Sequence, residues 1–273
     1  MALSRRLNAG GWQTRGTCRD PNRVRALTAL GIKAALFEGS APMDPAGALD
    51  GVTHVLLSIP PGAEGDLAFI HHADLIAETE SVQWVGYLST TGVYGNRDGA
   101  WVDETSELRP SNPRGQRRVN AEQTWLEWGA RHGIAAHIFR LAGIYGPGRS
   151  VAEKIKEGSS RRISKPGHVF SRIHVEDVAT VLAASIVSPR AGGIYNVCDD
   201  EPAASADVTS YVCDLLGVVA PPLISFENAE MSVMGKTFWA DNRRVRNDRI
   251  KTELGVELAF PNYRAGMRSV LGL

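Results

Sequence analysis

A short apolar run that ends in hydroxyls constrains the fold more than any other feature of this sequence. Residues 84–88, WVGYL, read as a buried strand, and the hydroxyls of residues 89–91 follow directly at its end. A polar loop comes next, and then an amphipathic helix over roughly residues 115–132. Ligands of open α/β sheets bind outside the carboxyl ends of the strands. Hydroxyls at such a strand end, facing a helix that carries Arg114 and Arg118, therefore predict a crevice for an anion or a nucleotide.

Apolar runs and amphipathic helices alternate on both sides of this stretch. We predict further strands at residues 12–17, 32–37, 52–59, 135–139, 170–174 and 194–197, and helices at residues 2–8, 21–30, 66–78, 151–157, 175–187 and 205–216. Residues 161–165 read as a basic loop. Alternation at this spacing predicts a doubly wound parallel α/β sheet, with a smaller C-terminal α/β lobe. We place the first domain at residues 1–145, and the lobe mainly at residues 146–273, with segments that return to the first domain.

Composition narrows the class of ligand. The 273 residues suffice for one or two domains with a full core. Lys plus Arg is 30 and Asp plus Glu is 30, so nothing favours nucleic acid or an anionic membrane as a partner. Three scattered cysteines and the lack of a long apolar run indicate a cytoplasmic protein. We therefore expect a small-molecule substrate and leave a homodimer open. His174 beside two acids is predicted to begin a helix rather than to hold a metal.

Several short motifs occur in the order in which one family carries them. They are Val93-Tyr94-Gly95, Ala121-Glu122, residues 173–179 (IHVEDVA), residues 195–197 (YNV) and residues 243–255. With these motifs the chain resembles the extended short-chain dehydrogenase/reductase family, the NAD-dependent epimerases and dehydratases. The resemblance implies a Rossmann-like domain. It also implies an NAD(P)-dependent oxidoreductase or epimerase acting on a hydroxyl or keto group, with nucleotide sugars among the substrates.

The chain departs from the family's catalytic motif, Tyr-x-x-x-Lys. Counting back from Ala121-Glu122, the Tyr position holds Arg114 and the Lys position holds Arg118. The resemblance implies that Thr90 bonds the substrate and that Arg118 keeps the positive charge of the Lys. Arg114 cannot cycle a proton near neutral pH, so another group must do so. Our first candidate is Tyr94; a water relayed by Thr90 is the second.

Two further positions bear on the chemistry. Tyr145, in the loop GIYGPG, is another phenol that could serve as a substitute acid. In the family's 4,6-dehydratases an Asp-Glu pair eliminates water, and the matching positions here hold Thr91 and Gly92. Neither can ionise in the way that elimination requires, so we do not expect dehydratase chemistry.

The cofactor is expected at the strand ends. We predict contacts from Thr17, Arg19, Ser58, Ile59, Pro60, Ser89 and Arg118. An Arg after the second strand of such a fold accommodates the 2′-phosphate of NADP, whereas an acid there favours NAD. Arg19 therefore favours NADP, and Asp20 beside it argues for NAD.

The family's G-x-G-x-x-G turn is absent from the sequence. The first residues read as the helix that would follow such a turn. We therefore expect the natural coding frame to extend upstream of Met1, with a strand and a Gly-rich turn.

Two classes of function are compatible with these sequence features. Thr90, the V-Y-G motif and Arg118 favour an enzyme, which we expect. Arg114 in place of the Tyr favours a non-catalytic NAD(P)-binding sensor or interaction protein on the same fold, which is the alternative.

Overall fold

Parallel strands form the main sheet of the computed structural model, which describes residues 1–39, 41–43 and 49–273. The strand order is β10 (Gly193–Val197), β6 (Ala135–Leu141), β4 (Trp84–Thr90) and β3 (His54–Leu57). The register pairs Thr90 with Leu141 at the carboxyl ends of β4 and β6. Every pairing in this sheet is parallel, so the carboxyl ends of its strands meet at one edge. The predicted parallel α/β fold is confirmed.

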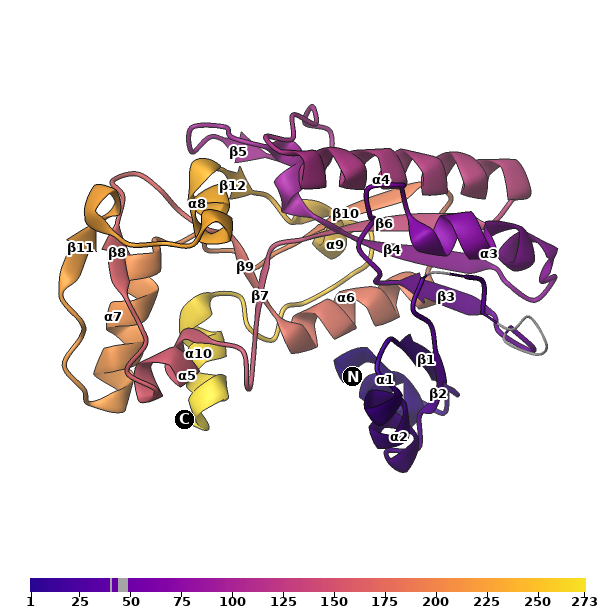
Figure 1. The fold of residues 1–273 in the computed structure, drawn as a ribbon, viewed down its shortest axis with the longest axis horizontal. Coiled ribbons are helices and arrows are strands. Elements are labelled where there is room, and N and C mark those ends of the chain that lie inside the picture. The colour runs from indigo at the N-terminus through magenta and orange to yellow at the C-terminus, as the bar shows by residue number, and fades with distance from the viewer. Residues whose placement is uncertain (40, 44–48) are drawn as a thin grey trace.

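Two further parallel strands form a separate sheet near the N-terminus. They are β1 (Arg15–Cys18) and β2 (Lys33–Leu36), and α2 (Pro21–Ala29) connects them. Figure 1 shows this unit beside β3 and next to α1 (Ala2–Ala9). Within the described residues no strand pairs with both β1 and β3. The upstream strand expected from the sequence stays a prediction.

Helices cover both faces of the main sheet, which makes three layers (Figure 1). On one face lie α3 (Leu67–Glu78) and α4 (Pro113–His132). On the other face α6 (Val175–Val187) packs with α1 and α9 (Asp248–Thr252), through a cluster that includes Leu3, Val181 and Ile250. Strands buried on both sides explain why residues 84–88 and 135–139 read as continuous apolar runs.

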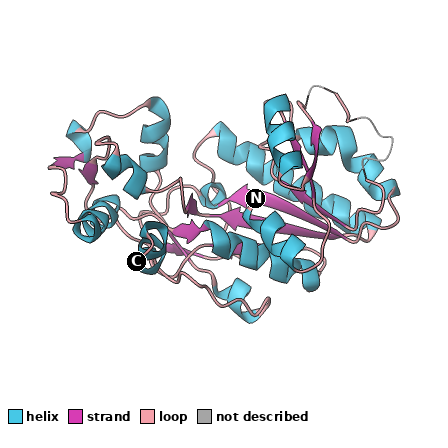
Figure 2. Cartoon of the chain, turned by 90° about the horizontal axis from the view of Figure 1, so that it is seen from below, coloured by secondary structure: helices cyan, strands magenta, loops and turns pink. Residues whose placement is uncertain are grey.

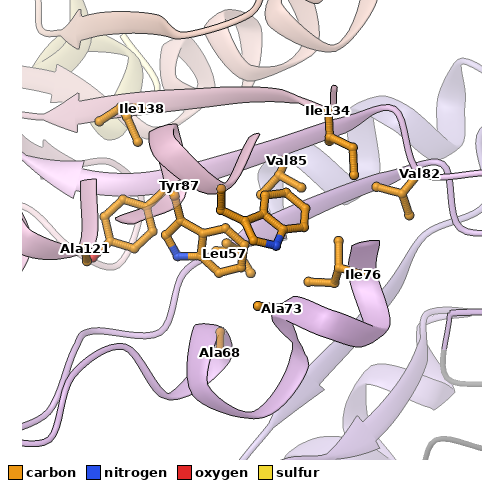
Figure 3. Packing of buried hydrophobic residues seen from close by; sticks show 12 residues of the cluster. Leu57, Ala68, Ala73, Ile76, Val82, Val85, Tyr87, Ala121, Ile134 and Ile138 are labelled. Atoms are coloured by element: carbon orange, nitrogen blue, oxygen red, sulfur yellow. The ribbon is translucent and has the colours of Figure 1, made fainter. Parts of the chain in front are cut away.

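The core under α3 and α4 is built from side chains that recur at the two-residue period of a strand and at the 3.6-residue period of a helix. Figure 3 shows Val85 and Tyr87 from β4 against Ala73 and Ile76 from α3. Alternate residues of β4 point to the opposite face of the sheet. There Trp84 is fully buried in the cluster that includes Val181 and Ile250. Both faces of β4 are thus fixed by packing, which holds the end of this strand in place.

The C-terminal part forms a smaller lobe beside the sheet (Figure 2). Its helices are α5 (Val151–Lys156), α7 (Ser205–Leu216), α8 (Val233–Ala240) and α10 (Tyr263–Leu271), and its two-stranded sheet is β8 (Arg162–Ser164) with β11 (Leu223–Ser225). Two short pairs join the lobe to the main sheet: β7 (Gly143–Tyr145) with β9 (Arg172–His174), and β5 (Trp101–Val102) with β12 (Arg244–Val245). The short helices η1 (Thr91–Tyr94) and η2 (Phe226–Asn228) complete the elements.

The predicted helices at 175–187 and 205–216 are confirmed at both ends. His174 begins α6 as expected, since its Nδ1 accepts a hydrogen bond from the Glu176 N–H at 3.3 Å. Residues 161–165 are not a loop, because they contain β8. The sequence did not predict α8, α10 and β11. In the part of the chain that the structure describes, no helix is long and apolar enough to cross a membrane.

Candidate active site

A cleft of about 980 Å³ opens between the carboxyl edge of the main sheet and the C-terminal lobe. Its inner end, defined here as Ser58, Ser89, Thr90, Thr91 and Arg118, comes from the ends of β3 and β4 and from α4. This is the edge at which open α/β sheets bind ligands. The structure therefore brings together four residues that the sequence assigned to the site, Ser58, Ser89, Thr90 and Arg118.

The two hydroxyls at the end of β4 differ in their freedom to bind a ligand. The Thr90 hydroxyl oxygen accepts a hydrogen bond from the Gly92 N–H at 3.1 Å, which leaves its hydrogen free to donate. The Ser89 hydroxyl donates instead to the buried carboxylate of Glu122. Thr90 is thus the hydroxyl available to a substrate, whereas Ser89 is held by the protein itself.

Arg118 lies half-buried beside these hydroxyls. Its Nη1 donates to the backbone carbonyl of Leu88 and to the Tyr87 hydroxyl at 3.4 Å, and its guanidinium lies 5.7 Å from the centre of the Tyr87 ring. Within the described residues its other N–H groups make no hydrogen bond, so they can serve a ligand. Arg114, one turn earlier, is exposed and does not line the cleft.

Tyr94 was the wrong candidate for the proton acceptor. It is fully buried and does not line the cleft. Its hydroxyl donates to Asn196 Oδ1 at 2.7 Å and accepts from Arg140 Nη1 at 2.9 Å. Burial raises the pKa of Tyr94 to about 12, although Arg140 opposes the shift. The turn aims this side chain into the interior, where it has a structural role.

The backbone conformation explains why the last position of the V-Y-G motif, Gly95, is a glycine. It has a φ of +65°, and a Cβ there would collide with the backbone carbonyl of Arg109. Only glycine fits this close approach of two backbone segments. The motif therefore fixes the loop that follows β4.

Tyr145 lines the cleft, but its hydroxyl does not face the inner end. The hydroxyl packs against Gly266 of α10 and has no hydrogen-bond partner among the described residues. Burial raises the pKa of Tyr145 far above its usual value. Neither candidate phenol thus reaches the inner end, whose polar side chains are hydroxyls and the Arg118 guanidinium.

The remaining predicted cofactor contacts lie at strand ends outside the lining of the cleft. Thr17, Arg19 and Pro60 are exposed, and Ile59 packs against the core under α3 and α4. The Asp20 carboxylate caps α2, because its Oδ1 accepts from the Asn22 N–H at 2.8 Å. These positions stay predictions.

The lobe side of the cleft holds residues that the sequence analysis did not identify, among them Arg149, Arg172, Phe238 and Trp239. No family motif that we used covers them. The sequence also contained a signal for Asp199 that was not used: two consecutive acids, Asp199 and Asp200, stand one residue beyond the matched residues 195–197.

Asp199 does not line the cleft, and neither of its carboxylate oxygens has a hydrogen-bond partner among the described residues. It is 1% exposed. Burial raises the pKa of Asp199 to about 8, and the Arg172 guanidinium offsets only part of this effect. Asp199 is therefore largely protonated in the folded protein at neutral pH.

This shift predicts a pH dependence of stability. Between about pH 4 and pH 8 the unfolded chain has lost the Asp199 proton and the folded chain keeps it. The free energy of unfolding therefore falls as pH rises through this window, by up to about 1.4 kcal/mol per pH unit. Asp199→Asn removes the titration, so the variant should gain stability relative to wild type from pH 5 to pH 8. Urea unfolding of both proteins at these two pH values measures the difference; a constant difference would contradict the assignment.

Comparison with known proteins agrees with this architecture. The model of the NAD dependent epimerase/dehydratase family matches residues 70–198. A functionally unknown conserved protein from Silicibacter pomeroyi DSS has a solved structure that is 49% identical. That match has a TM-score of 0.91 and covers 99% of this chain and 93% of that chain.

Two more distant relatives extend the comparison. Protein YeeZ of Escherichia coli strain K12 is 27% identical over 271 residues, which cover 96% of this chain and 93% of that protein. The structure of dTDP-glucose 4,6-dehydratase from Bacillus anthracis, in complex with NAD, is 14% identical with a TM-score of 0.77, and the match covers 99% of this chain and 91% of that chain. The dehydratase structure shows that the fold is shared, and the family model shows that the chain belongs to the NAD-dependent epimerase/dehydratase family.

Proposed function

We propose that this protein is an NAD(P)-dependent oxidoreductase that works in the direction of reduction, on a substrate with a carbonyl group. One observation carries the proposal: the inner end of the cleft presents donors that stay protonated at neutral pH and no group that accepts a proton. Oxidation of an alcohol and epimerisation through a ketone both begin with removal of a proton. Reduction of a carbonyl needs donors on the oxygen, which Thr90 and Arg118 supply.

The carboxylates that line the cleft do not alter this reasoning. Both oxygens of Glu153 accept hydrogen bonds at the start of α5, from the N–H groups of Gly148 and Ser150. Asp241 accepts from the Ser111 hydroxyl at 3.0 Å and pairs with Arg243 at 3.2 Å. Glu157 follows α5 on the lobe side. Within the described residues the acids of the cleft thus belong to the lobe or to ion pairs.

The roles of the inner residues follow from charge. A bound reduced nicotinamide supplies a hydride. Thr90 would orient the carbonyl by donating its free hydrogen, and the Arg118 guanidinium would stabilise the negative charge that develops on the oxygen. Water in the open cleft would then deliver the proton. Arg keeps its charge at any physiological pH, so this stabilisation does not depend on a titrating group.

We assign NADP as the preferred cofactor. Arg19 is exposed at the end of β1, and no ion pair among the described residues includes it. The Asp20 carboxylate, which could otherwise bond the ribose hydroxyls of NAD, is occupied as the cap of α2. The predicted contacts at Thr17, Ser58, Ile59, Pro60 and Ser89 would hold the rest of the cofactor.

A second candidate is a non-catalytic NAD(P)-binding sensor, which the exposed Arg114 in place of the family's Tyr favours. A screen of carbonyl compounds with NADPH, followed by absorbance at the nicotinamide band, separates the two functions. Cofactor binding without turnover of any compound would replace the reductase by the sensor.

Arg118→Met tests the reductase. The substitution keeps much of the apolar stem and removes the charge that stabilises the oxyanion. We expect kcat to fall by about 10²- to 10³-fold, the usual effect of losing one such donor. Arg114→Met, an exposed Arg one turn earlier on the same helix, is the matched control and should leave kcat unchanged. Equal kcat for Arg118→Met and wild type would remove Arg118 from the mechanism.

Arg19→Ala tests the choice of cofactor. The variant should bind NADPH more weakly by about 1.5–3 kcal/mol, the value of a hydrogen bond to a charged group, and bind NADH as wild type does. Fluorescence titration of both cofactors measures this. Lys33→Ala, at the amino end of β2, is the control. If Arg19→Ala weakened both cofactors equally, Arg19 would not contact the 2′-phosphate.

A further inference from the structure

Arg118 is held on its inner side by groups that carry no charge. Its Nη1 donates to the Leu88 backbone carbonyl and to the Tyr87 hydroxyl at 3.4 Å, and the guanidinium carbon lies 5.7 Å from the centre of the Tyr87 ring. We call Tyr87 and the Leu88 carbonyl the guanidinium cradle. Figure 3 shows the Tyr87 side chain in the core under α3 and α4, which buries it completely. Burial raises the pKa of Tyr87 far above its usual value, so the hydroxyl meets Arg118 as a neutral acceptor.

Two buried acids near the cradle are occupied by other groups. Burial raises the pKa of Asp66, and the Arg118 charge opposes this shift, so these two groups lie close enough to interact. However, Asp66 Oδ1 accepts from two backbone N–H groups at the start of α3, and Oδ2 accepts from the Trp125 indole at 3.3 Å. Glu122 forms the buried ion pair with Arg140. No ion pair in the described part of the chain includes Arg118, so its charge stays available to the cleft.

This arrangement uses the shape of a guanidinium. The group is planar and carries donors on more than one edge, so one edge can bond the protein while another faces a ligand. A planar cation also packs well on an aromatic ring. A lysine ammonium gathers its three donors at one point, and one that bonded the Leu88 carbonyl would stay at the strand. The cradle is therefore complementary to arginine.

We propose that Tyr87 is a positioning residue for Arg118, and that the guanidinium cradle fits arginine rather than the lysine that the family has at this position. Tyr87 does not line the cleft, so it acts on a ligand only through Arg118. By holding Nη1 it directs the remaining N–H groups of Arg118 toward the cleft. The inference rests on the proposed function in taking Arg118 as the group that stabilises the oxyanion.

Nuclear magnetic resonance of protein with isotope-labelled arginine tests the cradle without any substrate. Arg118→Met identifies the side-chain signals of Arg118 by their loss. Tyr87→Phe keeps the ring and removes the hydroxyl, so rotation of the Arg118 guanidinium should become faster by about 2- to 10-fold, the usual value of one hydrogen bond written as a ratio. Tyr195→Phe is the matched control, because Tyr195 is another fully buried tyrosine of the main sheet and packs on its opposite face. It should leave the Arg118 signals unchanged.

Steady-state kinetics with NADPH and a carbonyl compound that wild type reduces gives the second readout. Tyr87→Phe should lower kcat by about 2- to 10-fold and leave KM unchanged, because the charge that Arg118 stabilises develops only in the transition state. Arg118→Lys, although it restores the family's residue, should lower kcat further than Tyr87→Phe does. In the Arg118→Met background Tyr87→Phe should cause no additional loss, since no guanidinium is left to position. A purely structural role of Tyr87 would add its loss in both backgrounds.

Unchanged rotation of the Arg118 guanidinium in Tyr87→Phe overturns the proposal, and so does an unchanged kcat in that variant. Wild-type kcat in Arg118→Lys overturns the fit to arginine. The reductase is judged separately, on wild type alone. If wild type reduces no carbonyl compound, the reductase is rejected, and the rotation of the guanidinium in Tyr87→Phe and Tyr195→Phe still decides whether Tyr87 positions Arg118.

Discussion

The buried ion pair between Arg140 and Glu122 is the interaction on which the inner end of the cleft depends. Arg140 Nη2 lies 2.8 Å from Glu122 Oε2, and both side chains are at most 4% exposed. The pair connects β6 to α4, and it is extended by Ser89 of β4 and by Tyr94. Burying two charges costs solvation energy that only well-made hydrogen bonds offset. This network supplies those bonds, and in doing so it fixes the end of β4 against α4.

The same network explains what the cleft lacks. Tyr94 satisfies Arg140 and Asn196, and Asn196 in turn donates its N–H to Glu104 at 2.8 Å. A phenol bound in this way cannot also accept a proton from a substrate. Ser89 is likewise held by Glu122. What remains free at the strand end is the hydrogen of Thr90 and the outer N–H groups of Arg118, and on this basis we propose reduction rather than proton abstraction.

The sequence predicted the order of most elements, because apolar runs carry that information locally, and its strand-end hydroxyls do line the cleft. It could not predict that the Tyr94 side chain points into the interior. Tyr94 lies in a short turn, where no hydrophobic periodicity indicates the buried side, and its partner Arg140 is 46 residues away in the sequence. The lobe was harder still. Its strands β8 and β11 have three residues each, too few for a periodic pattern, and α8 is an eight-residue helix that contains Gly235. Residues on the lobe side of the cleft, such as Arg149 and Phe238, are far apart in the sequence, and only the tertiary structure brings them to one cleft.

Removing one member of the buried pair tests the central claim most directly. Glu122→Gln leaves Arg140 charged in the interior, so we expect the free energy of unfolding to fall by about 3–5 kcal/mol. The double variant Glu122→Leu with Arg140→Met removes both charges and should recover most of that loss, while its cleft loses the support for Ser89 and binds NADPH more weakly. Urea unfolding and NADPH titration of the three proteins provide the comparison. If Glu122→Gln were as stable as wild type and bound NADPH equally well, the pair would not be the support of this site.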